Sequence, residues 1–212
     1  MIKLILKIHL MVIYYIIIFS LILNFINPYT TSLILYRKVF YNYNIKKIKF
    51  ISIKKIPKYT KQMLIRTEDC NFYKHHGIDL DSIKNAMEIN KRIKCNSFGG
   101  STITQQVVRS LFLFPNKYMA RKYLEIVIAI IFDRLVSKER ILELYFNYAE
   151  WGKGIFGIEN ASNIYFGKSV KYLSYDESAK LIAILSSPIY NNPDNFYNRK
   201  DLLNRYNNLI FK

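Results

Sequence analysis

The longest apolar stretch of the chain lies near its start. Residues 8–26 are almost all Ile, Leu, Val, Phe, Met and Tyr, interrupted by three polar side chains. This length matches the ~20 apolar residues that a helix needs to cross a bilayer. Lys3 and Lys7 precede the stretch and no small-residue cleavage site follows it, which is typical of a retained signal anchor. We therefore predict a cytoplasmic tip and one transmembrane helix over residues 1–27.

Beyond this stretch, apolar residues recur at intervals of three and four. An example is the series Tyr123, Leu124, Val127, Ile130 and Ile131. Such spacing predicts helices, and it occurs over seven segments: 57–68, 79–90, 101–114, 117–136, 138–147, 157–166 and 175–186. Pro115 and Pro188 follow two of them, where a helix is expected to end. Because strand signals are few, we predict a mainly α domain over residues 57–212.

Residues 28–56 show no clear helical period and are rich in lysine and aromatic side chains. We interpret them as a basic membrane-proximal stalk that ends at Pro57, a residue suited to a first helical turn. The net charge of the chain is +17, and residues 1–66 carry twelve Lys or Arg and no acid. Such charge attracts nucleic acid, lipid headgroups or phosphates. Its position beside the apolar stretch favours a membrane surface.

The first two acidic residues of the chain, Glu68 and Asp69, are adjacent at the predicted end of a helix. Loops on a rigid scaffold often carry catalytic groups. A partly buried carboxylate near cations and histidines, here His75 and His76, can serve as a general base. A solvated helix end explains the same residues, so at this point both interpretations stay open.

A glycine pair precedes a hydroxyl-rich helix start at residues 99–106. Thr102 and Gln105 have the spacing of a capping box, and backbone amides at such a start attract phosphate oxygens. Four cations follow: Arg109, Lys117, Arg121 and Lys122. Together these features suit a pyrophosphate, whereas a well-capped helix is the purely structural alternative.

Two further groups also have a functional and a structural interpretation. Arg121, Lys122 and Glu125 are three and four residues apart, so they share one helical face. The alternative is an intrahelical ion pair, which is common on solvated surfaces and worth little there. Residues 147–157 hold the single Trp of the chain among amide and carboxylate groups, as sugar sites often do. The alternative there is a glycine-rich turn with a packed Trp.

In this order, the segments resemble the peptidoglycan glycosyltransferases of glycosyltransferase family 51, in their monofunctional form, over roughly residues 55–193. The motif Glu-Asp-x-x-Phe-x-x-His-x-Gly is matched by residues 68–77, and Gly-Gly-Ser-Thr-Ile-Thr-Gln-Gln by residues 99–106. Arg-Lys-x-x-Glu is matched by residues 121–125, and a fourth motif runs over residues 141–168. The chain departs from the usual Lys, Asn and Glu of the family at three positions: Arg109, Ser110 and Asp133.

The resemblance implies a lysozyme-like helical fold and the polymerisation of lipid II into β-1,4-linked glycan, with release of polyprenyl pyrophosphate. In an inverting reaction Glu68 would be the general base, and Glu125 the second catalytic residue, ordering the cations or holding a divalent ion. No cofactor would be required, although Mg²⁺ or Mn²⁺ could bind at Glu125. The implied substrate-binding residues are Asp69, Phe72, His75, Gly100, Ser101, Thr102, Gln105, Gln106, Arg109, Lys117, Arg121, Lys122 and Asn147.

The resemblance also implies a location in the bacterial inner membrane, single-pass, with the catalytic domain on the periplasmic side. The lysines after the anchor argue for the opposite orientation, but large domains translocate despite positive flanks. The expected partners are lipid II, the growing glycan strand and membrane lipids, with other cell-wall synthesis proteins as candidates and nucleic acid excluded.

Two other classes of function remain as alternatives. A muramidase or lytic transglycosylase would share the helical domain type, but the phosphate-directed cations and the anchor count against it. A non-catalytic membrane scaffold for cell-wall precursors, or a basic membrane protein that binds nucleic acid, would explain the charge and the apolar stretch. Neither would require Glu68 together with Glu125.

Overall fold

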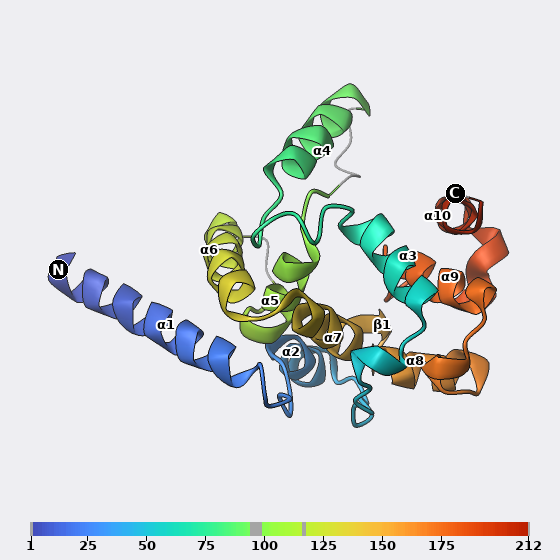
Figure 1. Cartoon of the computed structure of the whole chain (residues 1–212), viewed down its shortest axis with the longest axis horizontal. Helices are drawn as coiled ribbons and strands as arrows, with labels where there is room; N and C mark the ends of the chain where they lie inside the picture. The colour runs from blue at the N-terminus through green and yellow to red at the C-terminus, as the bar shows by residue number, and fades with distance from the viewer. Residues whose placement is uncertain (1, 94–98, 116–117, 212) are drawn as a thin grey trace.

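A computed structural model describes residues 2–93, 99–115 and 118–211. In this part of the chain the fold is mainly helical, which confirms the predicted class (Figure 1). The helices are α1 (Ile2–Ile22), α2 (Ser32–Tyr41), α3 (Lys58–Glu68), α4 (Leu80–Ile93), α5 (Ile103–Phe112), α6 (Met119–Leu135), α7 (Lys138–Tyr148), α8 (Ile158–Phe166), α9 (Tyr175–Ile184) and α10 (Lys200–Ile210). Single 3-10 segments lie at Ile53–Lys55, Val170–Tyr172 and Pro193–Asn198.

All seven helices predicted from the spacing of apolar residues are present, with ends that differ by a few residues. The sequence predicted neither α2 nor α10. It also did not predict the short antiparallel hairpin of β1 (Glu150–Gly152) and β2 (Ile155–Phe156).

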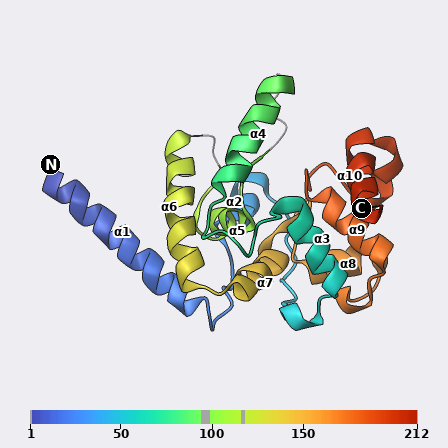
Figure 2. The same ribbon diagram turned by 45° about the horizontal axis from the view of Figure 1, so that its top comes forward.

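Helix α5 lies at the centre of the fold, as Figures 1 and 2 show. It packs against α2, α6 and α7. Its side chains are buried on most sides, and Ile103 and Val108 have no exposed surface. A helix surrounded in this way cannot shift without disturbing close-packed neighbours. The polar residues Gln106 and Arg109, which α5 also carries, are therefore held in defined positions.

Helices α3, α9 and α10 form a second group, on the side of the molecule away from α6 (Figure 2). The buried hydroxyls of Thr60 and Ser178 are 2.8 Å apart and join α3 to α9. Helix α10 packs on α9 and buries Leu202 and Leu209. These leucines, with Tyr206 between them, have helical spacing, so the pattern that predicts α10 is present in the sequence.

Residues 28–56 do not form the stalk that the sequence predicted. Helix α2 packs on α5, and the hydroxyl of Ser32 donates to the Leu111 carbonyl at 2.9 Å. Further along, Ile51 and Ile56 are buried in the core. The sequence showed no clear helical period in this segment, yet α2 forms there. A ten-residue helix takes most of its stability from packing against its neighbours, so the spacing of its apolar residues did not reveal it. The predicted boundaries at 27 and 56 stay predictions.

Helix α1 projects from the body of the fold (Figure 1). Its C-terminal part and the following turn contact α6, where Ile16 and Leu23 are buried and the Asn24 amide donates to the Leu135 carbonyl at 2.9 Å. Within the described residues, no helix combines the length and the apolar character that a membrane crossing requires. The transmembrane helix over residues 1–27 therefore stays a prediction.

Replacing Gly77 by alanine should destabilise the fold. Gly77 has φ +90°, and an added Cβ would lie 2.5 Å from the Ala129 carbonyl oxygen of α6. Backbone strain and overpacking together should cost roughly 2–5 kcal/mol of unfolding free energy. Thermal or urea denaturation measures the loss. Gly99→Ala is the matched control, since an added Cβ there meets nothing within 4 Å; equal stability of the two variants would contradict the prediction.

Candidate active site

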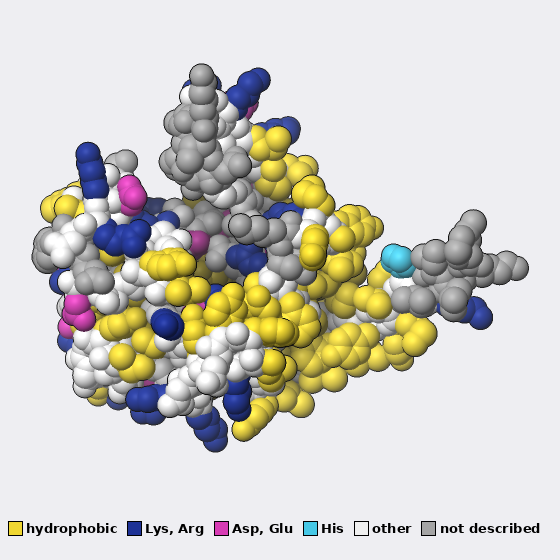
Figure 3. Space-filling model, turned by 180° about the vertical axis from the view of Figure 1, so that it is seen from behind, with side chains coloured by type: hydrophobic (Ala, Val, Ile, Leu, Met, Phe, Trp, Pro, Cys, Tyr) yellow, Lys and Arg dark blue, Asp and Glu magenta, His cyan; other side chains and the backbone are white. Residues whose placement is uncertain are grey.

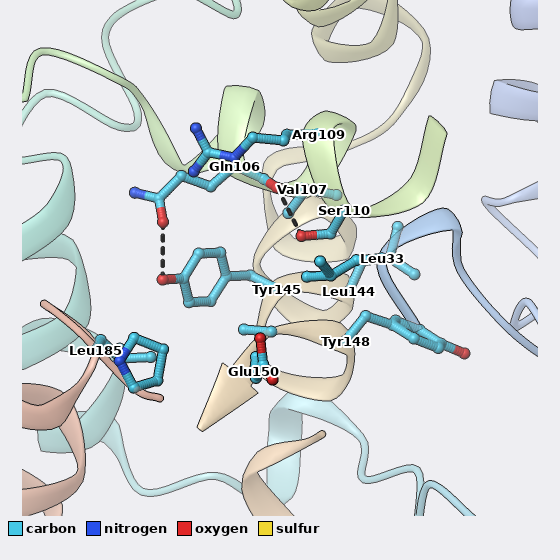
Figure 4. A pocket seen from close by; sticks show the side chains of 12 residues that line it. Leu33, Gln106, Val107, Arg109, Ser110, Leu144, Tyr145, Tyr148, Glu150 and Leu185 are labelled. Atoms are coloured by element: carbon cyan, nitrogen blue, oxygen red, sulfur yellow. Dashed lines mark hydrogen bonds between the residues drawn. The ribbon is translucent and has the colours of Figure 1, made fainter. Parts of the chain in front are cut away.

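Glu68 is the last residue of α3, and only 14% of its side chain is exposed. Its Oε2 accepts a hydrogen bond from Gln106 Nε2 at 3.0 Å, and its Oε1 forms an ion pair with Arg205 Nη2. The Tyr145 hydroxyl donates to Gln106 Oε1 at 3.1 Å, the contact drawn in Figure 4. Burial, reinforced by the Glu68 charge, raises the pKa of Tyr145 well above its usual value, so Tyr145 stays a donor.

Arg205 belongs to α10, and the sequence analysis did not identify it. Its helix is tied to α3, because the Arg66 guanidinium donates to the Leu209 carbonyl at 2.8 Å. It is also tied to α9, where the Tyr206 hydroxyl donates to Asp176. These contacts hold Arg205 against the carboxylate of Glu68.

The loop that follows Glu68 is fixed by the next residue, Asp69. The two oxygens of Asp69 lie 3.0 and 2.9 Å from His75 Nε2, and Oδ2 also accepts from the Ile103 amide at 2.8 Å. The Thr102 hydroxyl donates to the Gly77 carbonyl at 2.6 Å. The loop is thus joined at both ends to the start of α5.

The start of α5 has the predicted capping box. The Thr102 hydroxyl accepts from the Gln105 amide at 3.1 Å, and Gln105 Oε1 accepts from the Thr102 amide at 3.0 Å. The amides of Ile103 and Gln105 are therefore already bonded within the protein. These contacts favour the structural alternative, a well-capped helix. Gln105 is fully buried in the capping box and does not reach a cleft, as its predicted role would need.

Three cations surround Glu125, which is fully buried in α6. Its oxygens lie 2.6 Å from Arg121 Nη1, 2.7 Å from Lys122 Nζ and 3.7 Å from Arg109 Nη1. Lys122 also donates to the Ser101 hydroxyl at 3.0 Å. We call Arg109, Arg121 and Lys122 the cation cluster. Arg121 and Lys122 form intrahelical ion pairs with Glu125, as the structural alternative expected, but the carboxylate is buried and not on a solvated surface.

Two cavities flank the pair formed by Glu68 and Gln106. One, of about 210 Å³, is lined by Glu68, Ser101 and Thr102 among others. The other, of about 180 Å³, is lined by Gln106 and Arg109, as Figure 4 shows. Ser101 lines the Glu68 cavity and also accepts a hydrogen bond from Lys122, so it links that cavity to the cation cluster.

Comparison with known proteins identifies the family of the chain. Residues 37–212 match the family model described as "Transglycosylase". The chain belongs to the transglycosylase family. A biosynthetic peptidoglycan transglycosylase of Shewanella frigidimarina is 38% identical over 175 residues, which cover 81% of this chain and 74% of that protein.

Two other relatives extend the comparison. A biosynthetic peptidoglycan transglycosylase of Bordetella pertussis is 40% identical over 148 residues, or 68% of this chain and 61% of that protein. Penicillin-binding protein 1A of Aquifex aeolicus is 42% identical over 168 residues, or 79% of this chain but 23% of that protein. The predicted family is confirmed, and with it the enzyme class, peptidoglycan glycosyltransferase.

The predicted site residues of this transglycosylase fall into two groups. Those at the cavities or in the cation cluster and its partner are Glu68, Gly100, Ser101, Thr102, Gln106, Arg109, Arg121, Lys122 and Glu125. Those that are largely buried among protein groups are Asp69, which also lines the Glu68 cavity, and Phe72, His75, Gln105 and Asn147. Lys117 lies outside the described residues. In the transglycosylase, the side chains of the second group therefore mainly contact other protein groups and hold the loops and helices of the site in place.

Asn147 illustrates the second group. It is fully buried, its Nδ2 donates to the Ile51 carbonyl and its Oδ1 accepts from the Ile51 amide, both at 2.8 Å. The single Trp, Trp151, is likewise buried and stacks on Phe146 with ring centroids 6.1 Å apart. The burial of these two side chains favours the structural alternative for residues 147–157, a glycine-rich turn with a packed Trp.

Glu150 is a second buried carboxylate near the cavity of Figure 4. Its Oε2 accepts from Arg37 Nε at 3.0 Å. Burial raises the pKa of Glu150, and the Arg37 charge opposes that rise. The pair joins α2 to the hairpin and so stabilises the packing of residues 28–56 on the transglycosylase domain.

Asn147→Ala should lower stability, because it leaves the buried amide and carbonyl of Ile51 without partners. The expected loss is roughly 2–4 kcal/mol, measured by denaturation. Asn163→Ala is the control, since the Asn163 amide bonds only within α8, to Glu159. Unchanged stability combined with a raised KM would instead indicate that Asn147 contacts the substrate.

Proposed function

We propose that this chain polymerises lipid II into β-1,4-linked glycan strands with release of polyprenyl pyrophosphate, by an inverting mechanism in which Glu68 is the general base. The observation that carries the proposal is the position of Glu68. Its carboxylate is held by Gln106 and Arg205 and borders a cavity shared with Ser101, the hydroxyl partner of the cation cluster.

Glu68 would take the proton from the 4-hydroxyl of the acceptor sugar. The acceptor oxygen would then form a bond to the anomeric carbon of the donor, and the bond from that carbon to the pyrophosphate oxygen would break. The Gln106 amide and the Arg205 guanidinium keep the carboxylate in one orientation, which is what positioned proton transfer requires. The proton then leaves from Glu68 to solvent.

The surroundings of Glu68 favour a transferase over a glycosidase. A glycosidase needs a second carboxyl group to protonate its leaving group. The other carboxyls that line the Glu68 cavity are Asp69 and Asp79. Asp69 is bonded to His75 and the start of α5, and hydrogen bonds from Ser82 and Asn71 lower the pKa of Asp79 to about 2, below its usual range. Asp79 therefore stays ionised, and the oxygens of Asp69 already accept hydrogen bonds within the protein.

The cation cluster would bind the pyrophosphate and stabilise the charge that develops as it leaves. Arg109, Arg121 and Lys122 share one buried carboxylate, so these four groups carry a net charge of +2. Glu125 would act by ordering the cations in advance. Lys117 remains part of the proposed phosphate site because it is one of the four cations that follow residues 99–106 in the sequence.

We propose that the reaction requires no divalent cation. The described residues contain no group of three or more His, Cys, Asp or Glu side chains that could hold a metal. Mg²⁺ or Mn²⁺ at Glu125 would have to displace the cationic groups at 2.6 and 2.7 Å from its oxygens. The chain's own cations would thus supply the positive charge.

We further propose that the protein works at the bacterial inner membrane, single-pass, with its catalytic domain on the periplasmic side. Its partners would be lipid II, the growing strand, membrane lipids and other cell-wall synthesis proteins, and not nucleic acid. The exposed apolar side chains of α1, with Leu10, Met11 and Tyr14 more than half exposed, support contact with lipid.

Glu68→Gln should abolish polymer formation while leaving the fold intact. The detergent-solubilised protein is incubated with lipid II, and the products are separated by gel and digested with lysozyme. Glu88→Gln is the control, since this substitution makes the same chemical change at an exposed residue of α4. If neither parent nor variant makes polymer while both bind lipid II, the chain is a scaffold. If preformed strands are shortened by the parent, it is a lytic enzyme.

Arg205→Met should slow polymerisation by about 10–100-fold, because the carboxylate of Glu68 loses its charged partner. Arg205→Lys should restore part of the rate, and Arg199→Met, outside the start of the same helix, should have no effect. An unchanged rate of polymerisation in Arg205→Met would remove Arg205 from the mechanism.

A further inference from the structure

A third cavity lies away from Glu68, between α2 and the extended segment that follows it. Its volume is about 420 Å³, twice that of the cavity beside Glu68. The walls are mainly apolar and include Ile34, Leu35, Ile45, Ile48 and Phe50. Residues 27–30, which connect α1 to α2, form one end. The cavity therefore opens where the chain leaves α1.

Three lysines, Lys38, Lys46 and Lys47, line the same cavity. All three are exposed, and no carboxylate is among the residues that line it. Within the described part of the chain none of the three forms an ion pair, in contrast to the cation cluster around Glu125. An apolar cavity with unpaired cations at its edge is complementary to a molecule with an apolar chain and an anionic group.

The surface around the cavity is apolar as well. Phe25 and Tyr29 are 89% and 94% exposed, and Val39 and Phe40 of α2 are each 70% exposed. Figure 3 shows hydrophobic side chains extending from the projecting helix α1 over the adjoining face, with Lys and Arg side chains beside them. Amphipathic surfaces of this kind, with basic residues at the border, lie at the boundary between headgroups and acyl chains.

We propose that this cavity binds one anionic phospholipid of the surrounding membrane, with an acyl chain between α2 and residues 45–50 and the phosphate at Lys38, Lys46 and Lys47. The apolar chain would bury surface that is now open to water. The lysines would attract the headgroup, as clusters of basic residues near a membrane do. The proposal does not depend on the catalytic role of Glu68.

The test measures binding of pyrene-labelled phosphatidylglycerol to the purified full chain in a neutral detergent. The parent should bind one lipid per chain, with phosphatidylcholine bound much more weakly. The triple variant Lys38→Gln/Lys46→Gln/Lys47→Gln should bind about 100-fold more weakly. The control is a second triple variant, Lys54→Gln/Lys58→Gln/Lys61→Gln, which removes the same charge from the edge of another cavity. That cavity is also lined by Glu139, and the control variant should bind the lipid like the parent.

A second pair of variants tests the apolar part. Leu35→Trp should fill the cavity and prevent binding, whereas Val39→Trp, on the same helix but not lining the cavity, should not. Thermal denaturation confirms that each variant is folded.

Three results would overturn the proposal. An equal loss of lipid affinity in both triple-lysine variants would mean that the lipid is attracted by net charge alone. Equal binding of phosphatidylcholine and phosphatidylglycerol would mean that the anionic headgroup is not recognised. If inorganic phosphate displaced the labelled lipid and bound as tightly as the lipid does, the lysines would form a phosphate site that does not recognise an acyl chain.

Discussion

The carboxylate of Asp69 joins two segments that are far apart in the sequence. It is nearly buried, and it accepts hydrogen bonds from the His75 ring and from the Ile103 amide at the start of α5. Hydrogen bonds to a charged group are worth about 1.5–3 kcal/mol each, and a carboxylate at a helix N-terminus gains from the helix dipole. Because Glu68 directly precedes Asp69, this contact also fixes Glu68 against Gln106, one turn further along α5.

The motifs that mark the transglycosylase therefore contain two kinds of residue. Asp69 and Asn147 bond to other parts of the protein through both of their polar atoms, whereas His75 and Gln105 bond through one polar atom and leave Nδ1 and Nε2 buried without a partner among the described residues. A buried polar group without a partner is costly, and the bonds that each of these residues does make hold a loop or helix start in place. Gln106 lines a cavity, and its amide group orients the carboxylate of Glu68.

Charge is arranged differently in the two basic regions of the molecule. Around Glu125 the cations are brought together by a fully buried carboxylate, an arrangement that is stable only because several partners offset the cost of burying the charge. The repulsion among the three cations is thus offset within the folded protein. At the cavity beside α2 the lysines are exposed and remain separate, which suits a headgroup at a membrane surface.

The sequence by itself determined the helices and the groupings that are local. The capping box of Thr102 and Gln105 and the contacts of Glu125 with Arg121 and Lys122 were predictable, because they depend on spacings of three and four within one helix. Matching motifs likewise gave the family and enzyme class.

Only the tertiary structure decided the rest. Residues 32–41 form a helix because α5 gives them a surface to pack on, and a short helix has little stability of its own. Arg205 meets Glu68 across 137 positions of sequence, through the packing of α10 on α9. Whether a polar residue such as Asn147 faces a cavity or a buried backbone group depends on the same long-range packing. Local spacing contains no information about such contacts, because they form only when distant segments are brought together.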